Sequence, residues 1–188
     1  MRVIAGTYRS RPLKSLTGMD TRPTSDKLRE TFFNVLTAGN PEALAGSVWI
    51  DVFAGTGAVG IEALSRGARM AYFVESSGKA AGVIRTNLKS LEIEEGFEVV
   101  EKEAVRALRQ LDSEAIRADY VFLDPPYRMH EAYEEVLGFL SQSETVRPET
   151  VVIAEHDKRF DPGERVGALA RSRVLKSGDA ELSFYRIY

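Results

Sequence analysis

The sequence predicts an α/β fold: a mostly parallel, doubly wound sheet with an antiparallel C-terminal hairpin and a small N-terminal β-hairpin extension. Between residues 48 and 155, short apolar runs alternate with helical patterns, which is typical of parallel strands joined by crossover helices. Glycines cluster directly after the first of these runs. The tail holds two strand-like runs around Ser177-Gly-Asp, which is a hairpin signal.

The composition is that of one globular domain. The chain has 188 residues, of which 44% are hydrophobic and 28% are charged. It has no cysteine, which excludes disulfides, cysteine-ligated metals and a cysteine nucleophile. No apolar run approaches the roughly 18 residues of a membrane span, and the start lacks the apolar stretch of a signal peptide. We therefore expect no membrane partner, no metal site and a location in the cytoplasm.

The N-terminal extension is expected to begin with a hairpin of two short strands, residues 2–5 and 11–15. This hairpin carries Tyr8, Arg9 and Arg11.

A helix follows the hairpin, because apolar residues recur at helical spacing between positions 28 and 36. Thr24 or Ser25 can cap its start, and Gly39 can end it. We expect the extension to span residues 1–40.

The main domain is expected to span residues 41–188. Its predicted parallel strands are residues 48–53, 70–75, 97–101, 120–124 and 150–155. The predicted helices between and after them are residues 58–66, 79–91, 105–111 and 131–140, and the closing strands are 173–176 and 182–188. Ligands bind such sheets at the carboxyl ends of the strands. We therefore look for the site at residues 51–60, 75–77, 101–105 and 124–130.

Positive charge is concentrated at the start of the chain. The net charge is −3, yet residues 1–30 hold seven basic and three acidic side chains, while the remainder holds 18 basic and 25 acidic ones. Such an asymmetry can mark a phosphate-binding edge on an otherwise acidic protein, or only a solvated face.

A glycine-rich loop follows the first predicted strand. Gly55, Gly57 and Gly60 form the pattern G-x-G-x-x-G, which permits a tight turn and close approach of a ligand. Glu75 ends the next strand, where a carboxylate can accept hydrogen bonds from ribose hydroxyls. These features predict a nucleoside cofactor. Asp51 favours S-adenosylmethionine over a dinucleotide, because its carboxylate can accept from an ammonium group and would repel a pyrophosphate.

The fourth predicted strand ends in Asp124-Pro125-Pro126-Tyr127. Two prolines stiffen the turn and remove two N–H donors, so the strand end presents acceptors: the Asp124 carboxylate and carbonyl groups. Two fixed acceptors can hold both N–H groups of an exocyclic amine, and Tyr127 offers a ring on which a base can stack. Asp124 can also accept the proton that the amine loses. This arrangement predicts methyl transfer to an amino nitrogen of a nucleobase, mainly through positioning.

Together these motifs resemble the class I, S-adenosylmethionine-dependent methyltransferases with a Rossmann-like sheet, and among them the bacterial RsmD type. The resemblance covers nearly the full length. It includes the opening Arg2-Val-Ile-Ala-Gly-Thr-Tyr-Arg-Ser-Arg, the segment from Thr21 to Glu30, the glycine loop and the Asp-Pro-Pro-Tyr turn. The segment from Thr21 to Glu30 is the most specific part, because many methyltransferases share the others.

The resemblance implies a seven-stranded fold and methylation of N2 of one guanine in 16S ribosomal RNA, within an assembling 30S particle. It implies catalytic roles for Asp124, Pro125, Pro126 and Tyr127. The residues that it places at the cofactor are Asp51, Phe53, Gly55, Gly57, Glu75, Ser76, Glu103 and Ala104. Glu103 departs from the family pattern, which often has Asp or Asn at the adenine; its longer side chain or the backbone of Ala104 could serve.

The basic hairpin then gains a role in binding the substrate. Arg9 and Arg11 can neutralise RNA phosphates, and Tyr8 can stack on a base. Arg22 and Thr24 either close over the donor or the flipped base, or only cap the helix. A guanine amine inside a duplex cannot reach the turn, so the target must be unpaired or flipped out.

Three alternatives stay open on the sequence alone. The same chemistry could act on another RNA, or on adenine N6 or cytosine N4 of DNA. A dinucleotide-binding oxidoreductase would explain the glycines but not the Asp-Pro-Pro-Tyr turn. A non-catalytic RNA-binding module would leave the complete set of catalytic residues without a purpose.

Overall fold

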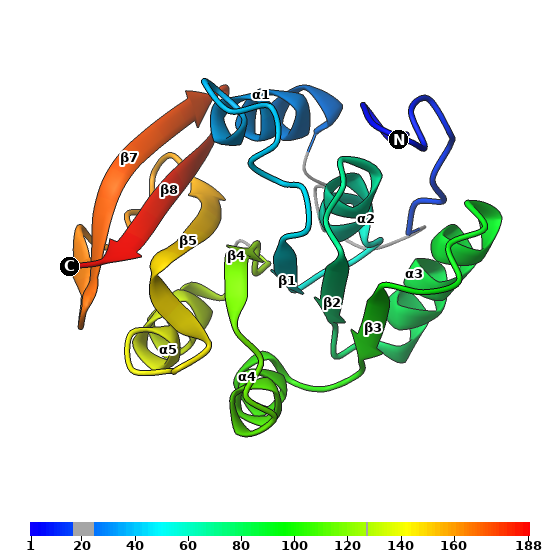
Figure 1. The fold of residues 1–188 in the computed structure, drawn as a ribbon. Helices are drawn as coiled ribbons and strands as arrows, with labels where there is room; N and C mark the ends of the chain where they lie inside the picture. Colours follow the sequence, from blue (N-terminus) through cyan, green and yellow to red (C-terminus); the bar gives the residue numbers. More distant parts are fainter. Residues whose placement is uncertain (17–24, 127) are drawn as a thin grey trace.

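The computed structural model describes residues 1–16, 25–126 and 128–188 and shows three layers, with helices on both faces of one sheet (Figure 1). The helices are α1 (Asp26–Leu36), α2 (Ala58–Ser65), α3 (Gly78–Ser90), α4 (Ala104–Ser113) and α5 (His130–Leu140). The strands are β1 (Val48–Val52), β2 (Met70–Val74), β3 (Phe97–Val100), β4 (Ala118–Leu123), β5 (Val146–Asp157), β6 (Arg165–Val166), β7 (Leu169–Ser177) and β8 (Ala180–Ile187).

The described strands form a single sheet in the order β3-β2-β1-β4-β5-β8-β7-β6. The pairs among β1 to β5 are parallel, and the pairs β5–β8, β7–β8 and β6–β7 are antiparallel. This confirms the predicted α/β fold with a mostly parallel sheet and an antiparallel C-terminal hairpin. The order reverses between β1 and β4, where doubly wound sheets bind their ligands.

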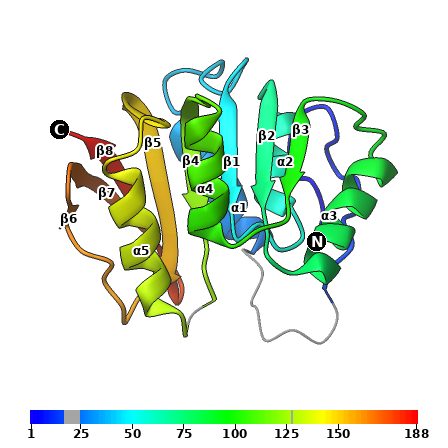
Figure 2. The same cartoon turned by 90° about the horizontal axis from the view of Figure 1, so that it is seen from below.

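Two apolar layers hold the helices onto the sheet. On one face, α1, α2 and α3 pack with the N-terminal segment around Trp49, Phe73 and Phe122. On the other face, α4 and α5 cover Ile50 and Val121, and Figure 2 shows these two helices from that side. Successive strand residues point to opposite faces, so the nearly continuous apolar runs of β1 and β4 serve both layers.

The predicted ends of the parallel strands were one residue too long. The strands β1, β2, β3 and β4 each end one position before the predicted bound. The residues that follow β2 and β4 still donate their N–H groups to the sheet, Glu75 to Val100 and Asp124 to Val52. Their side chains therefore stand at the edge where the backbone leaves the ladder.

The sheet has eight described strands, where the resemblance implied seven. The additional strand β6 is two residues long and pairs with β7 at the outer edge. A two-residue strand is too short to produce a pattern of alternating polarity.

The N-terminal hairpin is less regular than predicted. Its ends are joined by one antiparallel bridge, Arg2 to Pro12, and the structure forms no regular strands over residues 2–5 and 11–15. The reason is that Ile4 and Ala5 donate their N–H groups to the carboxylate of Glu62 on α2. The two arms are thus hydrogen-bonded to each other at Val3, and beyond this point the first arm is held by a helix side chain.

None of the helices in the described part of the chain combines the length and the apolar character that a membrane crossing requires.

Candidate active site at the carboxyl edge of the sheet

The register of the central strands brings three loops together. Val52 at the end of β1 lies beside Val74 of β2 and Leu123 of β4. The residues that follow these partners, Glu75 and Asp124, therefore flank the glycine loop that follows β1. The sheet thus assembles the predicted cofactor loop and the predicted catalytic turn at one edge, at the reversal of strand order.

The glycine loop is tightly shaped, and its two central glycines differ in what surrounds them. Both have left-handed backbones, with φ of 56° at Gly55 and 79° at Gly57. A Cβ on Gly57 would lie 3.2 Å from Ile84 Cγ2 and 3.3 Å from Phe73 Cε1, so this glycine permits packing. A Cβ on Gly55 would meet only the Phe53 carbonyl oxygen, at 4.0 Å. Gly55 therefore faces open space that a ligand can approach, beside the backbone of Phe53.

The carboxylate of Glu75 is held by two backbone donors. Its Oε2 accepts from Gly55 N at 2.9 Å, and its Oε1 accepts from Ser77 N at 2.8 Å. These bonds fix the acid beside the loop, and each oxygen keeps a further lone pair. Ser77 caps α3, while the neighbouring Ser76 is exposed. A half-buried carboxylate in this place fits the predicted contact with ribose hydroxyls.

Asp51 is a buried acid within β1. It is 2% exposed, and its Oδ2 accepts from Gly60 N, at the start of α2, at 2.9 Å. Burial raises the pKa of Asp51 from 3.8 to about 8, although the hydrogen bond from Gly60 opposes the shift and the charge of Glu75 adds to it. A cationic partner beside Asp51 would favour the charged form of this carboxyl group and so lower its pKa again.

The predicted adenine end of the site lies at the start of α4. Glu103 is the N-cap residue; its side chain is exposed and makes no capping hydrogen bond. Ala104 begins the helix and is 9% exposed. Glu103 therefore lies at the same edge as Glu75, with a carboxylate that is not used to cap its own helix.

The Asp-Pro-Pro turn follows β4 directly. Asp124 is half-buried and its N–H donates to Val52 O at 3.3 Å, which ties the turn to the end of β1. Pro125 is buried and Pro126 is exposed, and the Pro126 carbonyl accepts from Met129 N at 2.8 Å. Tyr127 lies outside the described residues, so the predicted stacking surface stays a prediction.

Three of the residues predicted to bind substrate, Tyr8, Arg9 and Arg11, lie on the segment that packs against α2 and α3. Tyr8 is half-buried and its N–H donates to Ser65 Oγ at 3.0 Å. Arg9 is exposed, and Arg11 is exposed with its guanidinium donating to Ser90 O at 2.7 Å. Arg22 and Thr24 lie outside the described residues, and their role stays open.

Sequence reasoning missed Asn87, which supports the glycine loop from α3. Its side chain donates to Thr56 O at 3.0 Å, between the two central glycines. A signal was present, because Asn87 interrupts the apolar phase that Ile84, Leu88 and Leu91 follow along this helix. A polar residue in such a phase indicates a buried polar contact.

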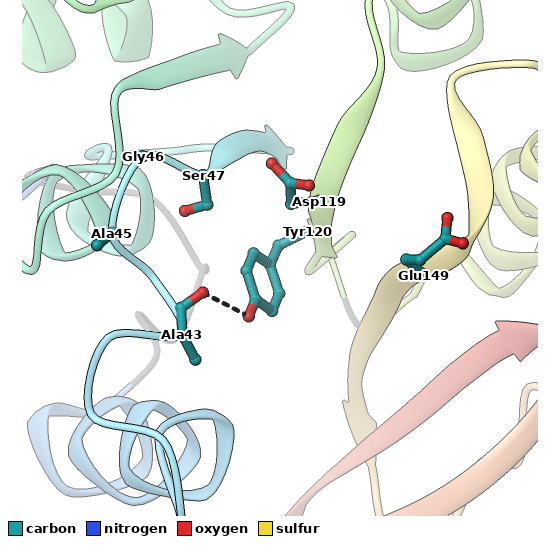
Figure 3. A pocket seen from close by; sticks show the side chains of 7 residues that line it. All are labelled: Ala43, Ala45, Gly46, Ser47, Asp119, Tyr120 and Glu149. Carbon is teal, nitrogen blue, oxygen red and sulfur yellow. Dashed lines mark hydrogen bonds between the residues drawn. The ribbon is translucent and has the colours of Figure 1, made fainter.

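A hollow of about 270 Å³ lies at the opposite edge, around the starts of β1 and β4. Figure 3 shows its lining and the hydrogen bond from Tyr120 Oη to the Ala43 carbonyl, 3.1 Å long. Asp119 faces it as well, and its carboxylate accepts from Val48 N at 2.8 Å. The polar groups here already serve the backbone at the start of the sheet, and ligands of such folds bind at the other edge.

The strand order, with a glycine loop and an Asp-Pro-Pro turn at its carboxyl edge, defines a class I methyltransferase fold. The chain belongs to the family described as Conserved hypothetical protein 95, whose model matches residues 1–186. It is similar to the YlbH protein of Bacillus subtilis (strain 168), with 34% identity over 186 residues, 99% of this chain and 98% of that protein.

Similarity extends to a named enzyme and to solved structures. The Ribosomal RNA small subunit methyltransferase D of Haemophilus influenzae is 34% identical over 159 residues, 84% of this chain and 79% of that protein. The solved structure of yhhF from Escherichia coli matches with a TM-score of 0.82 and 27% identity, and covers 100% of this chain and 97% of that one. SMU.776, a structure in complex with SAH, matches with a TM-score of 0.60 over 81% of this chain and 50% of that one; at 11% identity it shows the fold alone.

Proposed function

We propose that this protein transfers a methyl group from S-adenosylmethionine to an exocyclic amine of a nucleobase, namely N2 of a guanine in the RNA of the small ribosomal subunit. One observation carries the proposal: the register of β1, β2 and β4 sets Asp124 and its prolines beside the glycine loop and Glu75. A dinucleotide enzyme would need the loop but would leave this turn without a role.

The loops fit the methyl donor on their own chemistry. Glu75 offers lone pairs to the ribose hydroxyls, Gly55 leaves room for the ligand, and Asp51 would attract the ammonium of its amino acid end. Glu103 and Ala104 would hold the adenine at the start of α4. When bound, the sulfonium supplies an electrophilic methyl group, so the chain itself mainly positions the acceptor.

The Asp-Pro-Pro turn would hold the acceptor amine. An exocyclic amine has two N–H donors, and the Asp124 carboxylate with a turn carbonyl can accept both, which directs the nitrogen lone pair toward the donor. Asp124 would then accept the proton that leaves the nitrogen. Tyr127 is proposed to stack on the base, which is a contact worth roughly 1–3 kcal/mol.

The choice of guanine in small-subunit RNA is supported by the names of relatives and by the charge distribution. The enzyme of Haemophilus influenzae is named for the small ribosomal subunit. The exposed Arg9 and Arg11 lie on the segment that packs beside the glycine loop and could contact phosphates there. An assembling 30S particle is the substrate that we favour.

The test is to identify the methylated base. The purified protein receives tritiated S-adenosylmethionine with naked 16S RNA, with 30S particles from cells that lack this gene, or with plasmid DNA. Nuclease digestion and mass spectrometry then locate the label. We expect N2-methylguanine in the 30S sample or the naked RNA. Label in DNA, or on N6 of adenine or N4 of cytosine, would overturn the proposed substrate.

A further inference from the structure

Asn87 joins two segments that lie far apart in the sequence. Its Oδ1 accepts from Lys14 N at 2.7 Å, and its Nδ2 donates to Lys14 O at 3.2 Å and to Thr56 O at 3.0 Å. Thr56 is the residue between the two central glycines of the loop, and Lys14 belongs to the N-terminal segment. With Asn87 only 1% exposed, water cannot replace these partners readily.

A second contact joins the same two segments without Asn87. The Thr56 hydroxyl faces Met1 Sδ at 3.8 Å, and Thr56 is 9% exposed. Val3 and Leu13 of the N-terminal segment and Ala54 before the loop are buried in the apolar layer on the same face of the sheet. A shift of the loop would therefore disturb packed and hydrogen-bonded groups of the N-terminal segment.

The same helix also holds the basic part of that segment. Arg11 donates from its guanidinium to Ser90 O at 2.7 Å, one turn after Asn87 on α3. Tyr8, Arg9 and Arg11 lie between the two points at which Asn87 and Met1 attach the segment to the loop. The residues proposed to bind RNA are thus carried by backbone whose ends are fixed at the cofactor loop.

We propose that Asn87 is a positioning residue that couples the two regions: a ligand at the glycine loop orders the N-terminal segment, and RNA on that segment strengthens binding at the loop. The coupling is reciprocal, because thermodynamic linkage requires each ligand to change the affinity for the other by the same factor. The side chain of Asn87 is hydrogen-bonded to both Lys14 and Thr56, so its loss should weaken the coupling strongly while the contact of Thr56 with Met1 remains. The effect of RNA on binding at the loop, the RNA half of this proposal, rests on the proposed function. The ordering of the N-terminal segment by a ligand at the loop, the loop half, does not.

The first experiment uses no RNA. Hydrogen exchange of the backbone amides of residues 2–11, 13 and 14 is measured by NMR, with and without saturating S-adenosylhomocysteine. We expect the exchange of the Lys14 amide to slow by about fivefold on binding, at the low end of typical coupling between sites. Unchanged exchange in the saturated wild-type protein would overturn the proposal without any variant.

Two variants test whether the slower exchange depends on the side-chain amide of Asn87. Asn87→Ala should strongly reduce the response at Lys14, and Asn87→Asp should do the same, because it keeps the acceptor for Lys14 N but loses the donor to Thr56 O and to Lys14 O. Thr86→Ala is the matched control: it is the preceding residue of α3, and its hydroxyl donates to Gly82 O at 2.9 Å within the helix. A full response in Asn87→Asp, or its loss in Thr86→Ala, would contradict the assignment.

A second experiment adds the RNA. Affinity for S-adenosylhomocysteine is measured by calorimetry with and without 16S RNA, and we expect an increase of about fivefold in the wild type and a clearly smaller one in Asn87→Ala. An exchange response without this increase would refute the RNA half and leave the loop half standing. A wild-type protein that binds no S-adenosylhomocysteine would refute the proposed donor together with both halves.

Discussion

The glycine loop and the N-terminal segment lie side by side but are held in place by different means. The loop is shaped mainly by its own backbone and by strand register: glycines adopt left-handed backbones, register sets the acids around them, and Asn87 adds one hydrogen bond from α3. The N-terminal segment has one bridge of its own and is held from outside by Glu62, Ser65 and Asn87.

The two regions should therefore lose their structure in response to different kinds of substitution. A locally built loop should fail when a local backbone or packing requirement is broken. A segment held by buried side chains of other elements should fail when one distant residue is changed.

The largest effect is expected from Glu62→Gln, which removes the buried charge that holds the N-terminal segment. Glu62 is fully buried, accepts from Ile4 N and Ala5 N, and pairs with Arg66 Nε at 2.7 Å and Arg29 Nε at 3.7 Å. Loss of its charge leaves a buried arginine poorly compensated, so the free energy of unfolding should fall by about 3–5 kcal/mol in urea denaturation.

The control for this variant is Glu144→Gln, at the exposed pair with Arg117. Its cost should stay below about 1 kcal/mol, because solvent screens such pairs. Equal losses in Glu62→Gln and Glu144→Gln would show that the buried network does not hold the segment.

The next effect is expected from Gly60→Ala, which breaks the packing under the loop. A Cβ at this position would lie 2.4 Å from Phe73 Cε1 and 2.9 Å from Phe73 Cζ, inside the core. We expect a loss of about 1–3 kcal/mol from overpacking, measured by urea denaturation. Gly82→Ala in α3 meets nothing within 4 Å and should instead stabilise by about 0.5–1 kcal/mol. A stabilising Gly60→Ala would contradict the structure of the loop.

A smaller effect is expected from pH, through Asp51. The pKa of Asp51 is raised to about 8, so the folded chain holds a proton that the unfolded chain releases near pH 3.8. This group therefore contributes stability below about pH 4 that is lost as the pH rises through about 8. Between pH 5 and 6, the wild type should lose about 1.4 kcal/mol relative to Asp51→Asn. Parallel stability curves of the two proteins would contradict the assignment.

The smallest effect is expected from the exposed arginines of the N-terminal segment. Replacing Arg9 and Arg11 by Ala should leave a folded protein that lacks the bond from Arg11 to Ser90 O. It should weaken binding to 16S RNA and lower the salt slope by about 1.5, since each lost phosphate contact removes about 0.7–0.9. Filter binding at several salt concentrations measures the RNA affinity and its salt slope. A double alanine variant at Arg147 and Arg165, which are exposed on β5 and β6, removes the same charge. Equal slopes in the two double variants would place the RNA elsewhere.

The same contrast explains which parts were predictable from the sequence. The order of strands and helices, the glycine loop and the edge that holds Asp51, Glu75 and Asp124 follow from patterns within short windows. β5 was predicted too short, because Pro148 and exposed charged neighbours break the pattern where the strand begins.

The N-terminal contacts could not be predicted in this way. Glu62 and Ile4 are 58 positions apart, and Asn87 and Lys14 are 73 apart. No local pattern records which helix side chain will complete a distant hairpin. The division of the chain near residue 40 stays a prediction, although Phe32 and Phe33 of α1 pack in the same cluster as Trp49.

The most direct test of the account is to separate donor binding from methyl transfer at Asp124. Affinity for S-adenosylmethionine is measured by calorimetry, and single-turnover transfer to the RNA substrate is followed with tritium, for the wild type and for Asp124→Ala. We predict that Asp124→Ala binds the donor with nearly wild-type affinity and transfers no detectable methyl group. Transfer at the wild-type rate, or a collapse of donor affinity in a folded Asp124→Ala protein, would contradict the division of labour between the turn and the glycine loop.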